Sequence, residues 1–86
     1  LDSKTFNNAH YMALFVSHHF PAWAQVPAMW LYDIGDYVRR GQVICEGEVE
    51  KKAFGIQAPC TGHIVEKCLD DDDDFTVGDI LGYIQM

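Results

Sequence analysis

The chain has 86 residues and a formal net charge of −7, with six Lys and Arg side chains against thirteen Asp and Glu. A hydrophobic fraction of 49% is sufficient for one packed core in a small domain. The scarcity of basic side chains excludes the phosphate-binding surface of a nucleic-acid-binding protein and disfavours contact with anionic lipid. We therefore expect one small acidic domain that binds neither nucleic acid nor membrane.

The longest apolar run, residues 11–16, is far shorter than the roughly 20 residues that span a bilayer. No basic segment followed by an apolar stretch marks a secretion signal at the start. Cys45, Cys60 and Cys68 make an odd count without CxxC spacing, which favours free thiols. These features predict a reducing compartment, either the cytoplasm or the mitochondrial matrix.

Residues 1–10 are polar and aperiodic, and they are predicted to form a flexible N-terminal tail or linker before a domain at residues 11–86. Apolar runs separated by turn signals then predict short strands at residues 11–16, 28–32, 42–47, 54–58, 63–69 and 80–84. Pro21 and Pro27 reduce the segment between them to an edge strand or a loop. No segment sustains a helical period over about ten residues, so the predicted class is all-β.

Two groups of potential metal ligands are better explained without a metal. His18 and His19 are adjacent, so their side chains point to opposite faces of an extended chain. Residues 70–74 are five consecutive aspartates, without the ligand spacing or the flexible glycine of a calcium loop. We expect a solvated turn at the aspartates, no metal site and no catalytic residues.

A repeat links the two halves of the chain. The pattern Val38-x-x-Gly41-Gln42-Val43-Ile44 reappears as Phe75-x-x-Gly78-Asp79-Ile80-Leu81, an offset of 37 residues (38 to 75). The same offset places Gly35-Asp36 over Asp72-Asp73, so both motifs follow an acidic turn. Two halves of similar pattern predict two small sheets that face each other with quasi-two-fold symmetry.

Residues 48–53 lie between two predicted strands and form a charged turn. A reversal near Glu50-Lys51 would place a lysine at the tip of a hairpin, with its amine in solvent. Taken alone, such a turn is more often just a solvated connection.

The ordered set of motifs resembles the biotinyl/lipoyl carrier domains, over residues 11–86. The matching positions are Gly35-Asp36, Val38, Gly41, Val43-Ile44, Glu46, Glu48, Lys51, Ala58-Pro59-Cys60-Thr61-Gly62 and Val77-Gly78-Asp79. The resemblance implies a flattened barrel (a barrel-sandwich hybrid) of two four-stranded sheets with quasi-two-fold symmetry. It also implies a cofactor-bearing lysine at the tip of one hairpin.

The residues around the lysine indicate which cofactor the resemblance implies. Lipoyl domains have Glu-x-Asp-Lys-Ala, whereas biotinyl domains have Met-Lys-Met. The segment Glu48-Val49-Glu50-Lys51 lacks both methionines, which favours lipoic acid on Lys51. Two departures are Glu50 in place of the usual Asp and Lys52 in place of a small residue. Lys52 is the fallback attachment site, on the opposite face of the hairpin.

The function implied by the resemblance is that of a swinging-arm carrier. A lipoyl arm would shuttle acyl groups between active sites of a 2-oxo acid dehydrogenase complex, while the domain itself stays non-catalytic. Glu48 and Glu50 would be recognised by the lipoyl protein ligase and by partner subunits of the multienzyme complex. The alternatives are a biotin carboxyl carrier domain of a carboxylase or decarboxylase, and an unmodified barrel that acts as a binding module.

Overall fold

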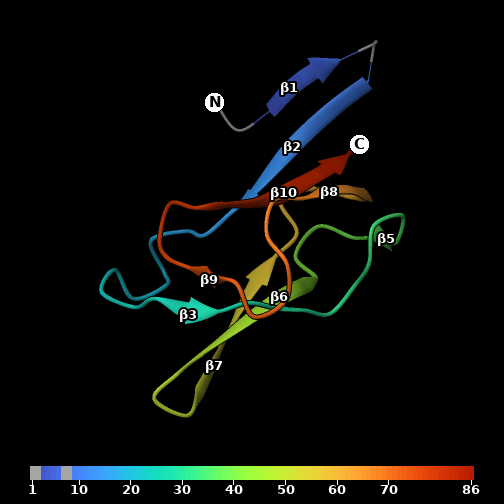
Figure 1. Ribbon diagram of the computed structural model, residues 1–86. Helices are drawn as coiled ribbons and strands as arrows, with labels where there is room; N and C mark the ends of the chain where they lie inside the picture. Colours follow the sequence, from blue (N-terminus) through green and yellow to red (C-terminus); the bar gives the residue numbers. More distant parts are fainter. Residues whose placement is uncertain (1–2, 7–8) are drawn as a thin grey trace.

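The computed structural model describes residues 3–6 and 9–86, with side chains described from His10 onward. The fold is all-β, and the described residues contain no helix (Figure 1). The strands are β1 (Ser3–Phe6), β2 (Ala9–Phe15), β3 (Val26–Pro27), β4 (Met29–Trp30), β5 (Tyr37–Val38), β6 (Val43–Val49), β7 (Lys52–Gln57), β8 (Gly62–Lys67), β9 (Asp74–Phe75) and β10 (Ile80–Gln85). The described part of the chain therefore also has no helix that could cross a membrane.

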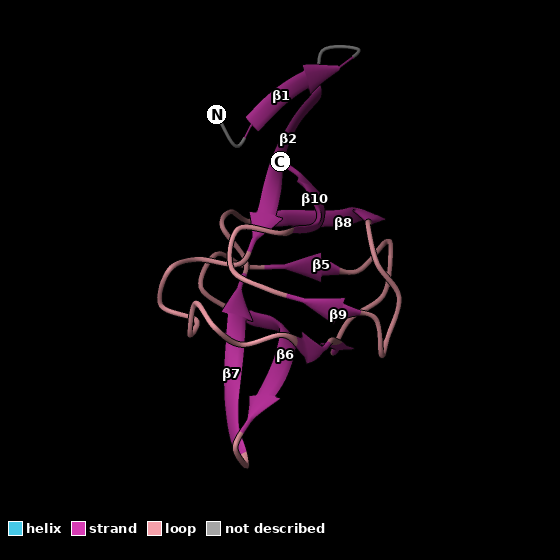
Figure 2. Ribbon diagram, turned by 60° about the vertical axis from the view of Figure 1, so that its left-hand side comes forward, coloured by secondary structure: helices cyan, strands magenta, loops and turns pink. Residues whose placement is uncertain are grey.

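The strands form three antiparallel sheets. The largest has the order β1-β2-β10-β8-β5, the second β4-β6-β7, and the third pairs β3 with β9. Figures 1 and 2 show the β6–β7 hairpin projecting from one end of the molecule and the β1–β2 pair from the other. The two projections account for the elongated dimensions of 42 × 24 × 21 Å.

The sheets differ from the predicted pair of four-stranded sheets at Ala28. Its N–H donates to the carbonyl of Asp73 (2.8 Å), and its own carbonyl accepts from the N–H of Asp72 (2.9 Å). The chain therefore leaves the sheet of β9 after Pro27 and enters the sheet of β6 at Met29. One predicted strand at residues 28–32 is replaced by the short strands β3 and β4 on either side of Ala28.

The second difference is β1, which adds a fifth strand to the largest sheet. The sequence predicts a flexible tail over residues 1–10, but Ser3–Phe6 pairs antiparallel with residues 9–12. A polar segment can form such a strand because an edge strand is stabilised by backbone hydrogen bonds and needs no continuous apolar face. Residues 1, 2, 7 and 8 of the predicted tail lie outside the described residues.

The 37-residue repeat recurs in the hydrogen bonds of the turns. Backbone N–H groups at equivalent positions donate to equivalent side-chain oxygens: Asp33 to Asp36 and Asp70 to Asp73 (2.8 Å each), Arg39 to Gln42 (3.0 Å), and Thr76 to Asp79 (2.9 Å). Gly41 and Gly78 both have φ of 90°. Asp72, at the position equivalent to Gly35, also has a positive φ, 72° against 96°. The aspartate run thus contains a turn of the same geometry as the glycine-containing turn of the first half.

Four apolar positions of the repeat lie at the centre of the core. Val38, Ile44 and Leu81 are completely buried, and Phe75 is 1% exposed. Around them pack buried side chains from the largest sheet and from both sides of the hairpin, including Leu14, Val16, Phe20, Val26, Trp30, Ile56, Ile64 and Ile84. The repeat therefore specifies one shared core.

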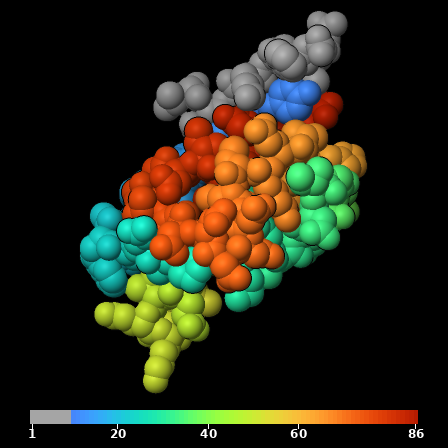
Figure 3. Space-filling model, in the orientation of Figure 1, coloured from blue at the N-terminus to red at the C-terminus, as the bar shows by residue number. Residues whose placement is uncertain are grey.

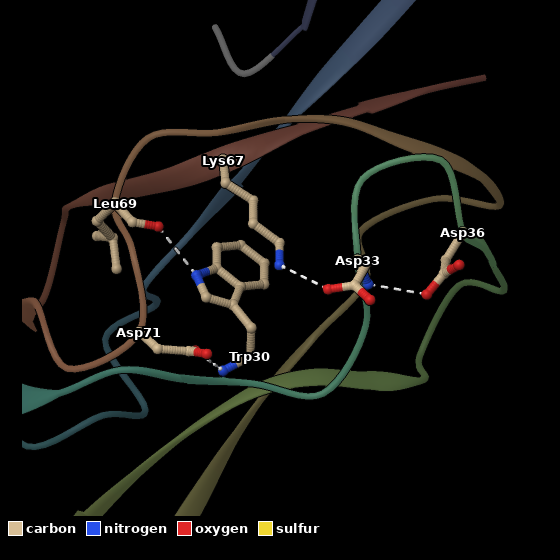
Figure 4. A network of polar contacts seen from close by, with 6 residues as sticks. All are labelled: Trp30, Asp33, Asp36, Lys67, Leu69 and Asp71. Carbon is tan, nitrogen blue, oxygen red and sulfur yellow. Dashed lines mark hydrogen bonds and ion pairs between the residues drawn. The ribbon is translucent and has the colours of Figure 1, made fainter.

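Trp30 joins the aspartate run to this core (Figure 4). Its indole N–H donates to the carbonyl of Leu69 (3.0 Å), and its backbone N–H donates to Asp71 Oδ1 (2.8 Å). Lys67 Nζ lies 4.8 Å from the centre of the Trp30 ring and 3.6 Å from Asp33 Oδ1. The aspartate run is consequently an ordered turn whose carboxylates accept backbone hydrogen bonds, in agreement with the predicted turn.

Substitution of Gly41 tests the turn geometry. Gly41→Ala should lower the free energy of unfolding by about 1–2 kcal/mol, because an L-residue is disfavoured at this positive φ. Gly41→Asn should lose less, because asparagine enters this region more readily. Urea denaturation measures both, and an unchanged midpoint for Gly41→Ala would contradict the left-handed conformation.

Candidate functional site

The candidate site is the hairpin formed by β6 and β7, which confirms the predicted reversal near Glu50-Lys51. Side chains alternate along β6, so Cys45 and Val49 are buried against the body while Glu48 is exposed. Gly47 lies on the inward face, where an added Cβ would come within 2.6 Å of Val26 Cγ2 and 2.8 Å of Phe75 Cζ. The base of the hairpin is therefore packed so closely that only glycine fits.

The tip of the hairpin is a two-residue reversal. Val49 pairs with Lys52, which leaves Glu50 and Lys51 as the connecting residues, with φ of 50° and 67°. Positive φ at both positions is typical of a type I′ turn, for which Asn-Gly is the favoured sequence. A non-glycine residue in this region carries a cost of about 1–3 kcal/mol. The tip therefore holds two residues in a conformation that their own chemistry disfavours.

The two lysines at this tip have different surroundings. Both are exposed, and no carboxylate within residues 10–86 lies in ion-pair contact with either amine. Lys52 belongs to β7, and its Nζ lies 5.5 Å from the centre of the Phe54 ring. Lys51 belongs to the turn, and within the described part of the chain its amine makes no cation–π contact. The amine of Lys51 is therefore the freer of the two.

The two glutamates predicted to be recognised lie on different parts of the hairpin. Glu50 is a turn residue beside Lys51, whereas Glu48 pairs with Ala53 along the strands. Glu48 lines a groove of about 460 Å³, together with Pro27, Ala28, Met29, Glu46, Gly47, Ala53, Asp71 and Asp72. The two aspartates of this groove, Asp71 and Asp72, follow Glu48 by more than 20 residues along the chain, so no local sequence pattern indicates that they adjoin the hairpin.

The connection at residues 17–25 also lies beside the hairpin, and the sequence motifs do not indicate this. Phe20 contacts Phe54 of β7 edge-on, with ring centres 5.5 Å apart, and it also contacts Phe75. Trp23, in the same connection, is 71% exposed. The contact between Phe20 and Phe54 holds the 17–25 connection against β7.

The described residues offer no group of three or more His, Cys, Asp or Glu side chains arranged to hold a metal ion. The rings of His18 and His19 lie 4.6 Å apart, and both side chains are exposed. Burial raises the pKa of Cys45 to about 11 and also raises the pKa of Cys60. Both thiols therefore stay protonated near neutral pH, which opposes a nucleophilic role.

Comparison with known protein families places the chain in a family. The family whose model matches is described as a domain of unknown function (DUF8500), and the match covers residues 1–64. The chain belongs to the DUF8500 family. No curated protein matches it significantly. The region shared with DUF8500 includes the whole β6–β7 hairpin and Lys51.

Glycine substitutions at the tip test whether the turn is strained. Glu50→Gly and Lys51→Gly should each raise the free energy of unfolding by about 1 kcal/mol, because glycine accepts positive φ without a steric penalty. Lys52→Gly is the control and should lower it by about 0.5–1 kcal/mol, because glycine weakens a strand. Destabilisation by all three substitutions in urea would contradict a strained two-residue turn.

Proposed function

We propose that this DUF8500 domain is a carrier that bears lipoic acid in amide linkage on Lys51. The observation that carries the proposal is the two-residue tip, where Lys51 stands exposed at the end of the projecting hairpin (Figure 2). A group attached there extends away from the body. Strain of this kind is retained at functional sites, and the disfavoured φ of Lys51 is an observed outlier of that type.

We further propose that the architecture is a barrel-sandwich hybrid with quasi-two-fold symmetry. The register of the sheets supports this, because pairs between β4 and β6 recur 37 residues later between β8 and β10. Met29 with Glu46 recurs as Glu66 with Tyr83, and Trp30 with Cys45 as Lys67 with Gly82. The register also shifts at equivalent places, between Val43 and Cys45 in β6 and between Ile80 and Gly82 in β10. If β1 is left out, the largest sheet has four strands, β2, β10, β8 and β5. If β3 and β4 are counted as one strand across Ala28, the two smaller sheets join into a second sheet of four strands, β9, β3–β4, β6 and β7.

The surroundings of the amine support Lys51 over Lys52 as the attachment point. The Lys52 amine lies over an aromatic ring, and its backbone is held in the β6–β7 ladder. Forming an amide at Lys52 would remove the charge that interacts with the ring of Phe54. Lys51 has no comparable contact recorded in the described residues, so its amine is available as the nucleophile that receives the acyl group.

The residues of the hairpin fit a lipoyl group better than biotin. Glu48 and Glu50 precede the lysine, and the methionines typical of biotinyl domains are missing from residues 48–53. When bound, the lipoyl group would supply a dithiolane that accepts and releases acyl groups. Lys51 holds it at a fixed end of the molecule, and the close packing at Gly47 keeps the base of the hairpin in place. Tethering of this kind raises the local concentration of the arm at each partner active site.

The partners under this proposal are a lipoyl protein ligase and the subunits of a 2-oxo acid dehydrogenase complex, in a reducing compartment. The exposed carboxylates of Glu48 and Glu50 give these proteins a charged surface next to the target amine. Biotin attachment by a biotin ligase, or a barrel that carries no cofactor, remain the competing outcomes of the test below.

Intact-mass measurement after co-expression with a lipoyl ligase, and separately with a biotin ligase, tests the attachment. We expect one lipoyl adduct on the unaltered chain, loss of the adduct in Lys51→Arg, and full modification of Lys52→Arg. Both variants keep the charge, so the matched pair isolates the position of the amine. A biotin adduct alone, or no adduct with either ligase, would contradict the proposal.

A further inference from the structure

A surface segment that begins at Met29, in the groove beside the hairpin, exposes four large apolar side chains. Met29, Leu31, Ile34 and Tyr37, here called the apolar strip, are 57, 45, 59 and 55% exposed. In Figure 3 the green atoms, which belong to the later part of this segment, lie on one side of the body, away from the yellow-green hairpin tip. Single exposed apolar residues are ordinary, but a succession of them marks an interaction surface.

The repeat provides an internal control for the apolar strip. Its four positions correspond, 37 residues later, to Glu66, Cys68, Asp71 and Asp74, which are exposed as well. The turns between these positions have the same hydrogen bonds in both halves. The fold therefore accepts charged side chains at three of the four positions, so folding does not require the apolar ones.

Strand β5 adds an open edge to the apolar strip. Tyr37–Val38 is the last strand in the order β1-β2-β10-β8-β5, and no other strand of the described chain pairs with its outer side. The equivalent strand β9 begins with Asp74 and follows four further aspartates, and such charges prevent pairing between sheet edges. Tyr37 gives β5 no such protection.

We propose that the apolar strip and the outer edge of β5 form the interface between two copies of this chain, related by a two-fold axis. The charges within and after the segment support a second copy as the occupant. Asp33 precedes Ile34, and its exposed carboxylate also lies 3.6 Å from Lys67 Nζ of the same chain. Arg39 and Arg40 follow the strand, and both side chains are exposed. An antiparallel two-fold arrangement brings the arginines of each copy toward Asp33 of the other, so the surface is self-complementary.

The net charge of the chain explains why two copies would associate only through a surface that contains Arg39 and Arg40. A net charge of −7 makes two copies repel each other in most orientations. Only four of the six basic residues lie outside the hairpin tip, and Arg39 and Arg40 are two of these. Because the surface is small, we expect a weak dimer with a dissociation constant of about 10–100 μM. Lys51 is not part of the apolar strip, so the dimer does not depend on its modification.

Sedimentation velocity of the full chain over a range of about 1–500 μM tests the dimer. We expect the unaltered chain to shift from monomer to dimer with concentration. Ile34→Asp combined with Tyr37→Asp should weaken dimerisation at least about tenfold, because it places on the strip the residues that the other half carries. Arg39→Glu combined with Arg40→Glu should weaken it similarly, by removing the charge pairing.

Ala22→Asp combined with Trp23→Asp is the matched control. It adds the same two negative charges at exposed positions of the 17–25 connection, and the dimer should persist. Circular dichroism and thermal unfolding verify the fold of each variant. If the strip variant unfolds, the arginine variant alone tests the dimer, because the exposed side chains of Arg39 and Arg40 are not part of the hydrophobic core. A monomer at every concentration, or a dimer unaffected by the altered strip or arginines, would overturn the proposal.

Discussion

The structure depends on the constraint that β6 must reverse into β7 within two residues. Cys45 and Val49 are fixed against the core, and Gly47 fits there only because it lacks a side chain. A shift of one residue would turn Glu48 toward the core and Val49 toward solvent, so the register is strongly specified. The tip must then consist of Glu50 and Lys51, whatever their own conformational preferences. Packing at the base of the hairpin therefore determines which lysine stands at its end.

The corresponding end of the other half of the molecule is built from two separate segments. There β10 ends, and the N–H of Met86 donates to the carbonyl of His10 (2.9 Å), near the start of β2. The same ladder geometry thus ends in a closed tip in one half and in separate strands in the other. The surfaces differ in a similar way, since Ile34 and Tyr37 occupy positions that hold aspartates 37 residues later. Turns with matching hydrogen bonds therefore carry different side chains in the two halves of the sequence.

The sequence predicts the features that depend on local patterns. The all-β class follows from short apolar runs and turn residues, and the reversal at Glu50-Lys51 follows from the strands that flank it. The break at Ala28 was not predictable, because its partners are backbone groups of Asp72 and Asp73. The polar segment of β1 has no alternating apolar pattern to indicate a strand, although it pairs with the adjacent residues 9–12. The contact of Phe20 with Phe54 has no local signal, because it depends on packing with a distant segment. Such contacts arise only when the chain is folded.

The most direct test of the account is the mass of the peptide containing Glu50 and Lys51 from the protein isolated from its native cells. Fragmentation of that peptide locates any adduct to one lysine. A carrier role for the hairpin predicts a lipoyl amide on Lys51 in a substantial share of the molecules, with Lys52 unmodified. Native protein with both lysines unmodified in every molecule would contradict a carrier role for the hairpin.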